Sequence, residues 1–123
     1  MILFKADMAQ AVIERRKTVT RRRGKKRWNV GSWHLLYTRR PYAKGGAKPF
    51  AKVQIVSVTE EAHPGDSIES GPALDEEAQK EGFDWWVGFE WKYAEINGSP
   101  SLFEPCWRVE WDPETMEVLE AEG

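Results

Sequence analysis

The chain is poor in the residues that build metal centres and disulfide frameworks. Its 123 residues include one cysteine, Cys106, and two histidines, His34 and His63, which lie far apart in the sequence. A single cysteine cannot form an internal disulfide, and this spacing matches no zinc-ligand motif. We therefore expect a protein without a metal or another cofactor, in a reducing compartment, the cytoplasm.

Long apolar runs are also absent. No stretch approaches the roughly 18 residues of a membrane span, and residues 1–7 lack the basic and apolar regions of a signal peptide. Hydrophobic residues nevertheless make up 41% of the chain and include seven tryptophans, which argues against disorder. We expect one soluble domain over residues 1–112, followed by an acidic tail over residues 113–123.

Acidic side chains are almost missing from the first part of the chain. Residues 1–53 hold 15 Lys and Arg against two acids, whereas residues 54–123 hold three Lys and Arg against 18 acids. The pI of about 5.8 therefore hides one strongly basic half. This asymmetry favours a polyanionic partner, nucleic acid first, although contact between the two halves would neutralise much of the charge.

The hydrophobic pattern predicts an α+β fold in the order β-α-β-β-β-α-α-β. The predicted strands cover residues 2–4, 18–20, 33–38, 50–59 and 106–111. The predicted helices cover residues 8–15, 73–80 and 85–96, with Asp7 and Asp84 as caps of the first and third. Few strands are joined by crossover helices, which indicates a small, mainly antiparallel sheet or barrel with flanking helices.

Basic side chains gather in two segments that we expect to contact phosphates. They are Arg21, Arg22, Arg23, Lys25, Lys26 and Arg27 in the first segment, and Arg39, Arg40, Lys44 and Lys48 in the second. Such contacts give affinity without sequence choice and weaken with salt. Trp28 lies beside the first segment, and we expect it to be exposed and to stack on a base. Core packing is expected instead for Trp33, Trp85, Trp107 and Trp111.

Three segments together resemble one known family. Residues 16–22, Arg-Lys-Thr-Val-Thr-Arg-Arg, are similar to a Gly-x-Lys-Thr-x-Thr-x-Arg signature. Residues 51–58 are similar to a barrel strand of the same family, and residues 75–83 to its Ala-x-x-Glu-Gly-Phe helix end. The family is the ASCH domain, a small β-barrel related to the PUA fold. The resemblance implies that RNA or a modified nucleoside binds in a cleft of the barrel.

One branch of this family hydrolyses the amide of N4-acetylcytidine, and by residue match the resemblance implies Lys17, Thr20 and Glu81 as catalytic residues. A threonine hydroxyl needs a neighbouring base, and a lysine serves as that base only if its pKa is lowered. Neighbouring arginines would lower the pKa of Lys17, and Glu81 would orient it or protonate the leaving amine. An ideal strand points Lys17 and Thr20 to opposite faces, so their meeting requires a corner at Lys17.

The chain departs from the family pattern in ways that bear on its substrate. Arg15 stands where the family usually has glycine, residues 23–27 add a basic loop, and the last predicted helix is rich in tryptophan. A larger basic rim fits a polynucleotide better than a free nucleoside. Three functions therefore stay open. The first is an amidohydrolase. The second is a domain that binds single-stranded RNA or DNA, or a ribonuclease that works without a metal, and the third is a non-enzymatic interaction module with a basic face.

Overall fold

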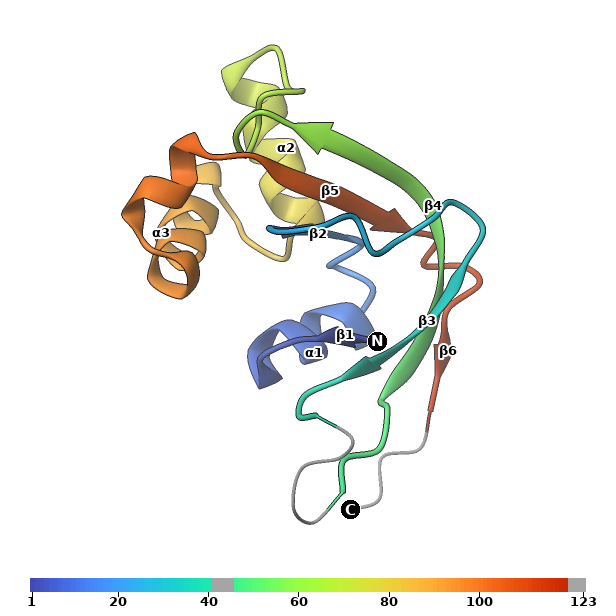
Figure 1. Ribbon diagram of the computed structural model, residues 1–123. Helices are drawn as coiled ribbons and strands as arrows, with labels where there is room; N and C mark the ends of the chain where they lie inside the picture. Colours follow the sequence, from blue (N-terminus) through green and yellow to red (C-terminus); the bar gives the residue numbers. More distant parts are fainter. Residues whose placement is uncertain (41–45, 120–123) are drawn as a thin grey trace.

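The computed structural model describes residues 1–40 and 46–119 (Figure 1). Its elements are β1 (Ile2–Leu3), α1 (Ala6–Ile13), β2 (Val19–Arg22), β3 (Trp33–Tyr37), β4 (Ala51–Glu61), α2 (Gly71–Lys80), α3 (Trp86–Asn97), the 3₁₀ helix η1 (Ser99–Phe103), β5 (Cys106–Trp111) and β6 (Glu117–Val118). The α+β class and the predicted order are confirmed. The sequence analysis missed η1 and β6, and β6 lies within the segment expected to be a tail.

The strands form one curled, mixed sheet with an open seam. Their order is β1-β3-β4-β5-β2, and β6 pairs with β4 outside this path. β1 runs parallel to β3, and the other pairs are antiparallel. The long strand β4 belongs to both halves of the sheet, and its register with β5 shifts between Ile55 and Ser57. β1 and β2 are the two end strands and do not pair with each other in the described part of the chain, so the sheet is a half-barrel.

The main hydrophobic core is built from alternate residues of the central strands. Val53 and Ile55 of β4 and Val109 and Trp111 of β5 are buried together, as the period of two along a strand requires. Trp28 joins this core with only 6% of its surface exposed. The expectation of an exposed Trp28 was therefore wrong, because its indole packs against apolar neighbours although cations flank it in the sequence.

Other tryptophans also differ from the expectation. Trp85 and Trp33, expected in the core, are 64% and 45% exposed. Trp111 is buried as predicted, and Trp107 is half-buried. The buried face of α3 contains Trp86 instead of Trp85, which was expected in the core.

A second apolar cluster joins α2 to α3. Phe89 and Tyr93 of α3 pack with Ala78 of α2. The first turn of α3 is capped from α2, because Asp75 Oδ1 accepts a hydrogen bond from the Trp86 backbone N–H at 3.0 Å. The predicted cap Asp84 is therefore wrong, since the polar partner comes from a neighbouring helix.

The start of α1 also differs from the prediction. Lys5, which makes no side-chain capping bond, precedes the helix, and Asp7 lies in the first turn. The Asp7 carboxylate accepts a hydrogen bond from the adjacent Met8 N–H at 3.0 Å. It still favours the helix start through its negative charge.

A tight corner connects α1 to β2. Arg15 has φ +64°, and it is the one non-glycine residue with positive φ in the described part of the chain. The N–H groups of Arg16 and Lys17 both donate to Ala11 O, at 3.0 and 3.1 Å, which ends the helix. The next N–H, of Thr18, donates to Lys80 O at 2.8 Å. The corner therefore sets Lys17 against the end of α2.

Candidate active site

A cleft of about 380 Å³ opens at the seam of the half-barrel. It is lined by residues of β2, of the β1–α1 segment, and of α2's end and α3. Its volume is within the range of small-molecule sites. The three residues that the family resemblance implies, Lys17, Thr20 and Glu81, all line this cleft although they are far apart in the sequence.

Lys17 is a buried ammonium with every proton engaged. Its Nζ donates to Glu81 Oε1 at 2.9 Å, to Glu81 O at 2.8 Å and to Val19 O at 2.8 Å. A lysine ammonium has three donors, so these acceptors satisfy it. Burial lowers the pKa of Lys17; Glu81 opposes this shift, and the nearby arginines Arg22 and Arg21 add to it. The expected lowering is therefore present, with burial as its main cause.

Glu81 is held from both sides. It is the residue at which α2 ends, and only 2% of it is exposed. One carboxylate oxygen accepts from Lys17, and the other accepts from Arg21 Nη1 at 2.8 Å. Two cations thus fix the orientation of this carboxylate, so it can hold Lys17 in one position in the cleft.

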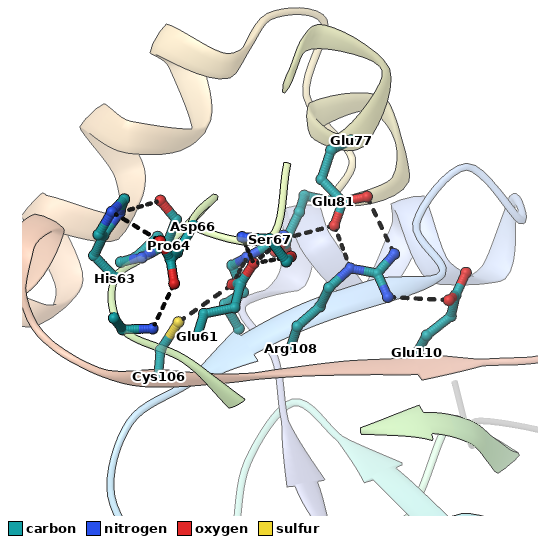
Figure 2. A network of polar contacts seen from close by, with 12 residues as sticks. Glu61, His63, Pro64, Asp66, Ser67, Glu77, Glu81, Cys106, Arg108 and Glu110 are labelled. Carbon is teal, nitrogen blue, oxygen red and sulfur yellow. Dashed lines mark hydrogen bonds and ion pairs between the residues drawn. The ribbon is translucent and has the colours of Figure 1, made fainter. Parts of the chain in front are cut away.

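Behind Glu81 lies a network of buried ion pairs (Figure 2). Arg21, whose side chain is fully buried, donates from Nε to Glu61 Oε1 and from Nη2 to Glu77 Oε2, both at 2.7 Å. Glu77 is also held by Arg108, which in turn pairs with Glu110 at 3.1 Å. Residues of the basic half and of the acidic half therefore meet inside the protein, so the two halves do neutralise part of each other's charge.

The pKa values of the network carboxylates follow from these contacts. Burial alone would raise the pKa of Glu61 and Glu77, but hydrogen bonds and charge from Arg21, with Arg108 at Glu77, lower both. Ser67 Oγ adds a 2.5 Å hydrogen bond to Glu61, and Cys106 Sγ lies 3.5 Å from it. Burial raises the pKa of the Cys106 thiol to about 12, so it stays protonated and unreactive.

Thr20 carries the candidate nucleophile. It is buried in the cleft, and its Oγ1 accepts a hydrogen bond from Arg22 Nε at 3.1 Å. Arg22 Nη2 donates to Leu3 O at 2.6 Å, and its guanidinium lies 4.9 Å from the centre of the Phe4 ring. Arg22 therefore bridges the seam between β2 and β1 and keeps a cationic donor on the threonine oxygen.

The residues expected to bind phosphates divide into three groups. Arg21 is wrong for this role because strand alternation turns its side chain into the ion-pair network. Arg22 is half-buried in the cleft, and Arg23 lines it while pairing with Glu104. The other described cations expected to bind are exposed; they are Lys25, Lys26, Arg27, Arg39, Arg40 and Lys48. Lys44 lies outside the described residues.

Several cleft residues were missed by the sequence analysis. Phe83, Phe89 and Tyr93 give the cleft an aromatic lining, and the spacing of four between the last two was the available signal. Tyr93 OH is buried and has no hydrogen-bond partner among residues 1–40 and 46–119. Burial raises the pKa of Tyr93, so its hydroxyl stays protonated.

The described residues form neither a metal-binding cluster nor a membrane-spanning helix. Between residues 1 and 40 and between 46 and 119, no group of three or more His, Cys, Asp or Glu side chains is placed to hold a metal ion. Within the same ranges, none of the helices has the length and apolar character needed to span a bilayer.

No protein-family model and no curated protein sequence matches the chain. Solved structures do share its fold. ASCH from Zymomonas mobilis gives a TM-score of 0.58 at 12% identity, covering 97% of this chain and 85% of that one. A Ser-to-Ala mutant of the same protein gives 0.56 at 15% identity, covering 90% of this chain, which spans 65% of that chain's length. A Tyr-to-Phe mutant gives 0.55 at 13% identity, with 97% and 88% covered. The chain therefore has the fold of an ASCH domain.

Proposed function

We propose that this cleft hydrolyses the amide of an N4-acylated cytosine such as N4-acetylcytidine. The observation that carries the proposal is the 2.9 Å contact of Lys17 with Glu81 in the cleft that Thr20 also lines. Buried charged groups with shifted pKa values in a cleft are typical of functional sites. The aromatic lining suits a planar base, and the volume suits a nucleoside.

The reaction begins with attack by Thr20. Its Oγ1 forms a bond to the acyl carbonyl carbon while its proton passes to the neutral amine of Lys17. The carbon–nitrogen bond then breaks, and the exocyclic nitrogen leaves as the cytosine amine with the proton returned from Lys17. Water hydrolyses the resulting ester on Thr20, which releases the carboxylic acid and restores the hydroxyl.

The neighbouring charges support these steps. Arg22 Nε already donates to Thr20 Oγ1, so it stabilises negative charge that develops on this oxygen. Glu81 Oε1 accepts a hydrogen bond from Lys17 Nζ and so keeps the amine beside β2. Lys17 must release one of its three contacts to act as the base, and burial makes the loss of a proton easier.

The decisive experiment measures deacetylation of N4-acetylcytidine, as a free nucleoside and within an RNA strand. We expect turnover by the parent and a loss of about 100-fold or more in Lys17→Ala, Thr20→Ala and Glu81→Gln. Thr18→Ala is the matched control, because Thr18 belongs to the same segment but does not line the cleft. Circular dichroism checks that each variant is folded. No turnover of either substrate by the parent would reject the proposal.

A second candidate, the binding of single-stranded RNA, is favoured by the position of the basic loop. Arg23 lines the cleft, and the exposed cations Lys25, Lys26 and Arg27 follow it directly. If these cations contact phosphates, Lys25→Ala/Lys26→Ala should reduce the slope of log Kd against log salt by about 1.4 for single-stranded RNA. Turnover of the free nucleoside should not change in this variant. An unchanged slope would exclude the loop from RNA binding.

A further inference from the structure

The outer edge of β2 is open. β2 ends the sheet, and among the strands of residues 1–40 and 46–119 it pairs only with β5. Trp111 N donates to Thr18 O at 3.1 Å, and the register then turns the backbone groups of Thr20 and Arg22 toward β5 as well. The N–H and C=O groups of the alternate residues, Val19 and Arg21, therefore point away from β5 toward the seam.

The part of Arg21 that reaches the cleft is its main chain. The Arg21 side chain has 0% exposure, whereas the whole residue is 5% exposed and lines the cleft. The accessible atoms must therefore belong to its backbone. A backbone N–H and C=O that face a binding cleft are a donor and an acceptor in fixed positions.

Within β2 this open edge holds two residues, Val19 and Arg21. On one side, Val19 O already accepts from Lys17 Nζ at 2.8 Å. Across the seam, Leu3 O already accepts from Arg22 Nη2 at 2.6 Å. An added peptide strand needs a longer row of backbone groups, so the edge suits a compact ligand with one acceptor next to one N–H.

The surroundings favour a flat ring. Phe4, Phe83 and Phe89 line the same cleft, and aromatic faces stack on planar bases. We propose that the backbone of Arg21 reads the base edge: its N–H donates to the ring acceptor N3 of cytosine, and its C=O accepts from the exocyclic N4–H. This assignment rests on the proposed function and names the atoms by which its substrate class is recognised. It brings the N4 substituent next to Thr20.

The test uses the wild-type protein and ligands that it cannot hydrolyse. Cytidine, N4,N4-dimethylcytidine and 3-deazacytidine are titrated while the ¹⁵N–¹H signal of Arg21 is followed by NMR. Dimethylcytidine lacks the N4–H, and 3-deazacytidine lacks the N3 acceptor. We expect cytidine to shift the Arg21 amide and each analogue to bind about five- to tenfold more weakly, as for one lost hydrogen bond. The control, 2′-deoxycytidine, changes the sugar alone and should shift Arg21 as cytidine does.

The outcomes separate this inference from the proposed function. An Arg21 amide that does not respond to millimolar cytidine, or equal binding of all three ribonucleosides, would overturn the inference even if N4-acetylcytidine is turned over. The expected shift and the expected losses would support it even if no turnover occurs, in which case the amidohydrolase assignment alone fails. A response of Arg21 to an extended peptide but not to cytidine would also overturn it.

Discussion

Arg15 shows how one strained residue builds the site. Its φ of +64° lies where the family pattern has glycine, and a non-glycine residue pays about 1–2 kcal/mol for this conformation. Arg15 therefore adopts a backbone conformation that glycine takes without strain. It carries Lys17 out of the strand alternation that would have pointed it away from Thr20, and both side chains reach the same cleft.

Replacing the strained residue should stabilise the protein. We expect Arg15→Gly to raise the free energy of unfolding by about 0.5–1 kcal/mol, because relief of the left-handed strain exceeds the entropy that glycine costs. Urea unfolding measures this change. Arg16→Gly is the control, since its φ is not positive, and it should lower stability. A destabilised Arg15→Gly would contradict the prediction.

The pKa of Lys17 predicts the pH profile of the proposed reaction. Burial lowers this pKa below its usual 10.5, and the base must be the neutral amine. Turnover should therefore rise with pH through the lowered pKa and level off before an exposed lysine would titrate. The profile of kcat for N4-acetylcytidine from neutral to alkaline pH measures this. A rate that falls over that range would show that Lys17 does not act as the base.

At the scale of elements, the end of α2 meets the corner after α1 at Gly82. Gly82 has φ +93°, and an added Cβ would lie 3.4 Å from Ala11 Cβ and 3.5 Å from Lys17 Cβ. The Phe83 N–H donates to Ala78 O at 2.8 Å, which closes the helix end. This closure fixes Glu81 opposite Lys17.

The conformation of Gly82 can be tested directly. We expect Gly82→Ala to lower the free energy of unfolding by about 1–2 kcal/mol, because alanine is strained at positive φ. Gly71→Ala is the matched control at the other end of α2, since a Cβ there meets nothing within 4 Å and its φ is not positive. Thermal or urea unfolding compares the two. Equal stability of the two variants would contradict the argument.

The elements were more predictable than the site. The buried alternation of residues 51–55 and the exact span of β5 followed from local pattern, whereas the alternation expected through residue 59 is lost after the register shift with β5. The inward turn of Arg21 did not, because its partners Glu61 and Glu77 lie on β4 and α2, far along the chain. A run of cations such as residues 21–23 is normally expected to be solvated. The burial of Arg21 follows only when the alternation of side chains along β2 is combined with the positions of Glu61 and Glu77.

At the scale of the whole molecule, the charge asymmetry of the chain is partly cancelled inside the fold. Arg21 from the basic half contacts Glu61, Glu77 and Glu81 from the acidic half. Removing one partner of a buried ion pair typically costs about 3–5 kcal/mol, because the remaining charges stay unpaired. One cation of the basic half, Arg21, thus stabilises the fold, while others, such as Lys25 and Lys26, lie in the exposed loop.

This network makes stability depend on pH. The pKa values of Glu61 and Glu77 are lowered in the folded state, so their stabilising contribution is full above the unfolded value of about 4.5 and is lost as pH falls through the folded values. We expect Arg21→Leu to be less stable than the parent by about 3–5 kcal/mol at neutral pH, with a smaller gap in acid.

Urea unfolding of both proteins at several pH values measures this gap. Arg23→Leu is the control, because the Arg23–Glu104 pair is exposed and should contribute at most about 1 kcal/mol. A gap that stays constant from neutral to acidic pH would show that the network carboxylates do not titrate with folding.

Side-chain contacts, not a strand ladder, close the seam of the half-barrel. β1 and β2 share no ladder, and the two wings of the sheet are continuous only through β4 (Figure 1). Moving β1 and β3 away from β5 and β2 would break contacts across the seam, such as the hydrogen bond from Arg22 Nη2 to Leu3 O. Every strand pair would stay intact. If the proposed reaction takes place in this cleft, we expect acyl groups longer than acetyl to enter through opening at the seam, with every helix and strand kept.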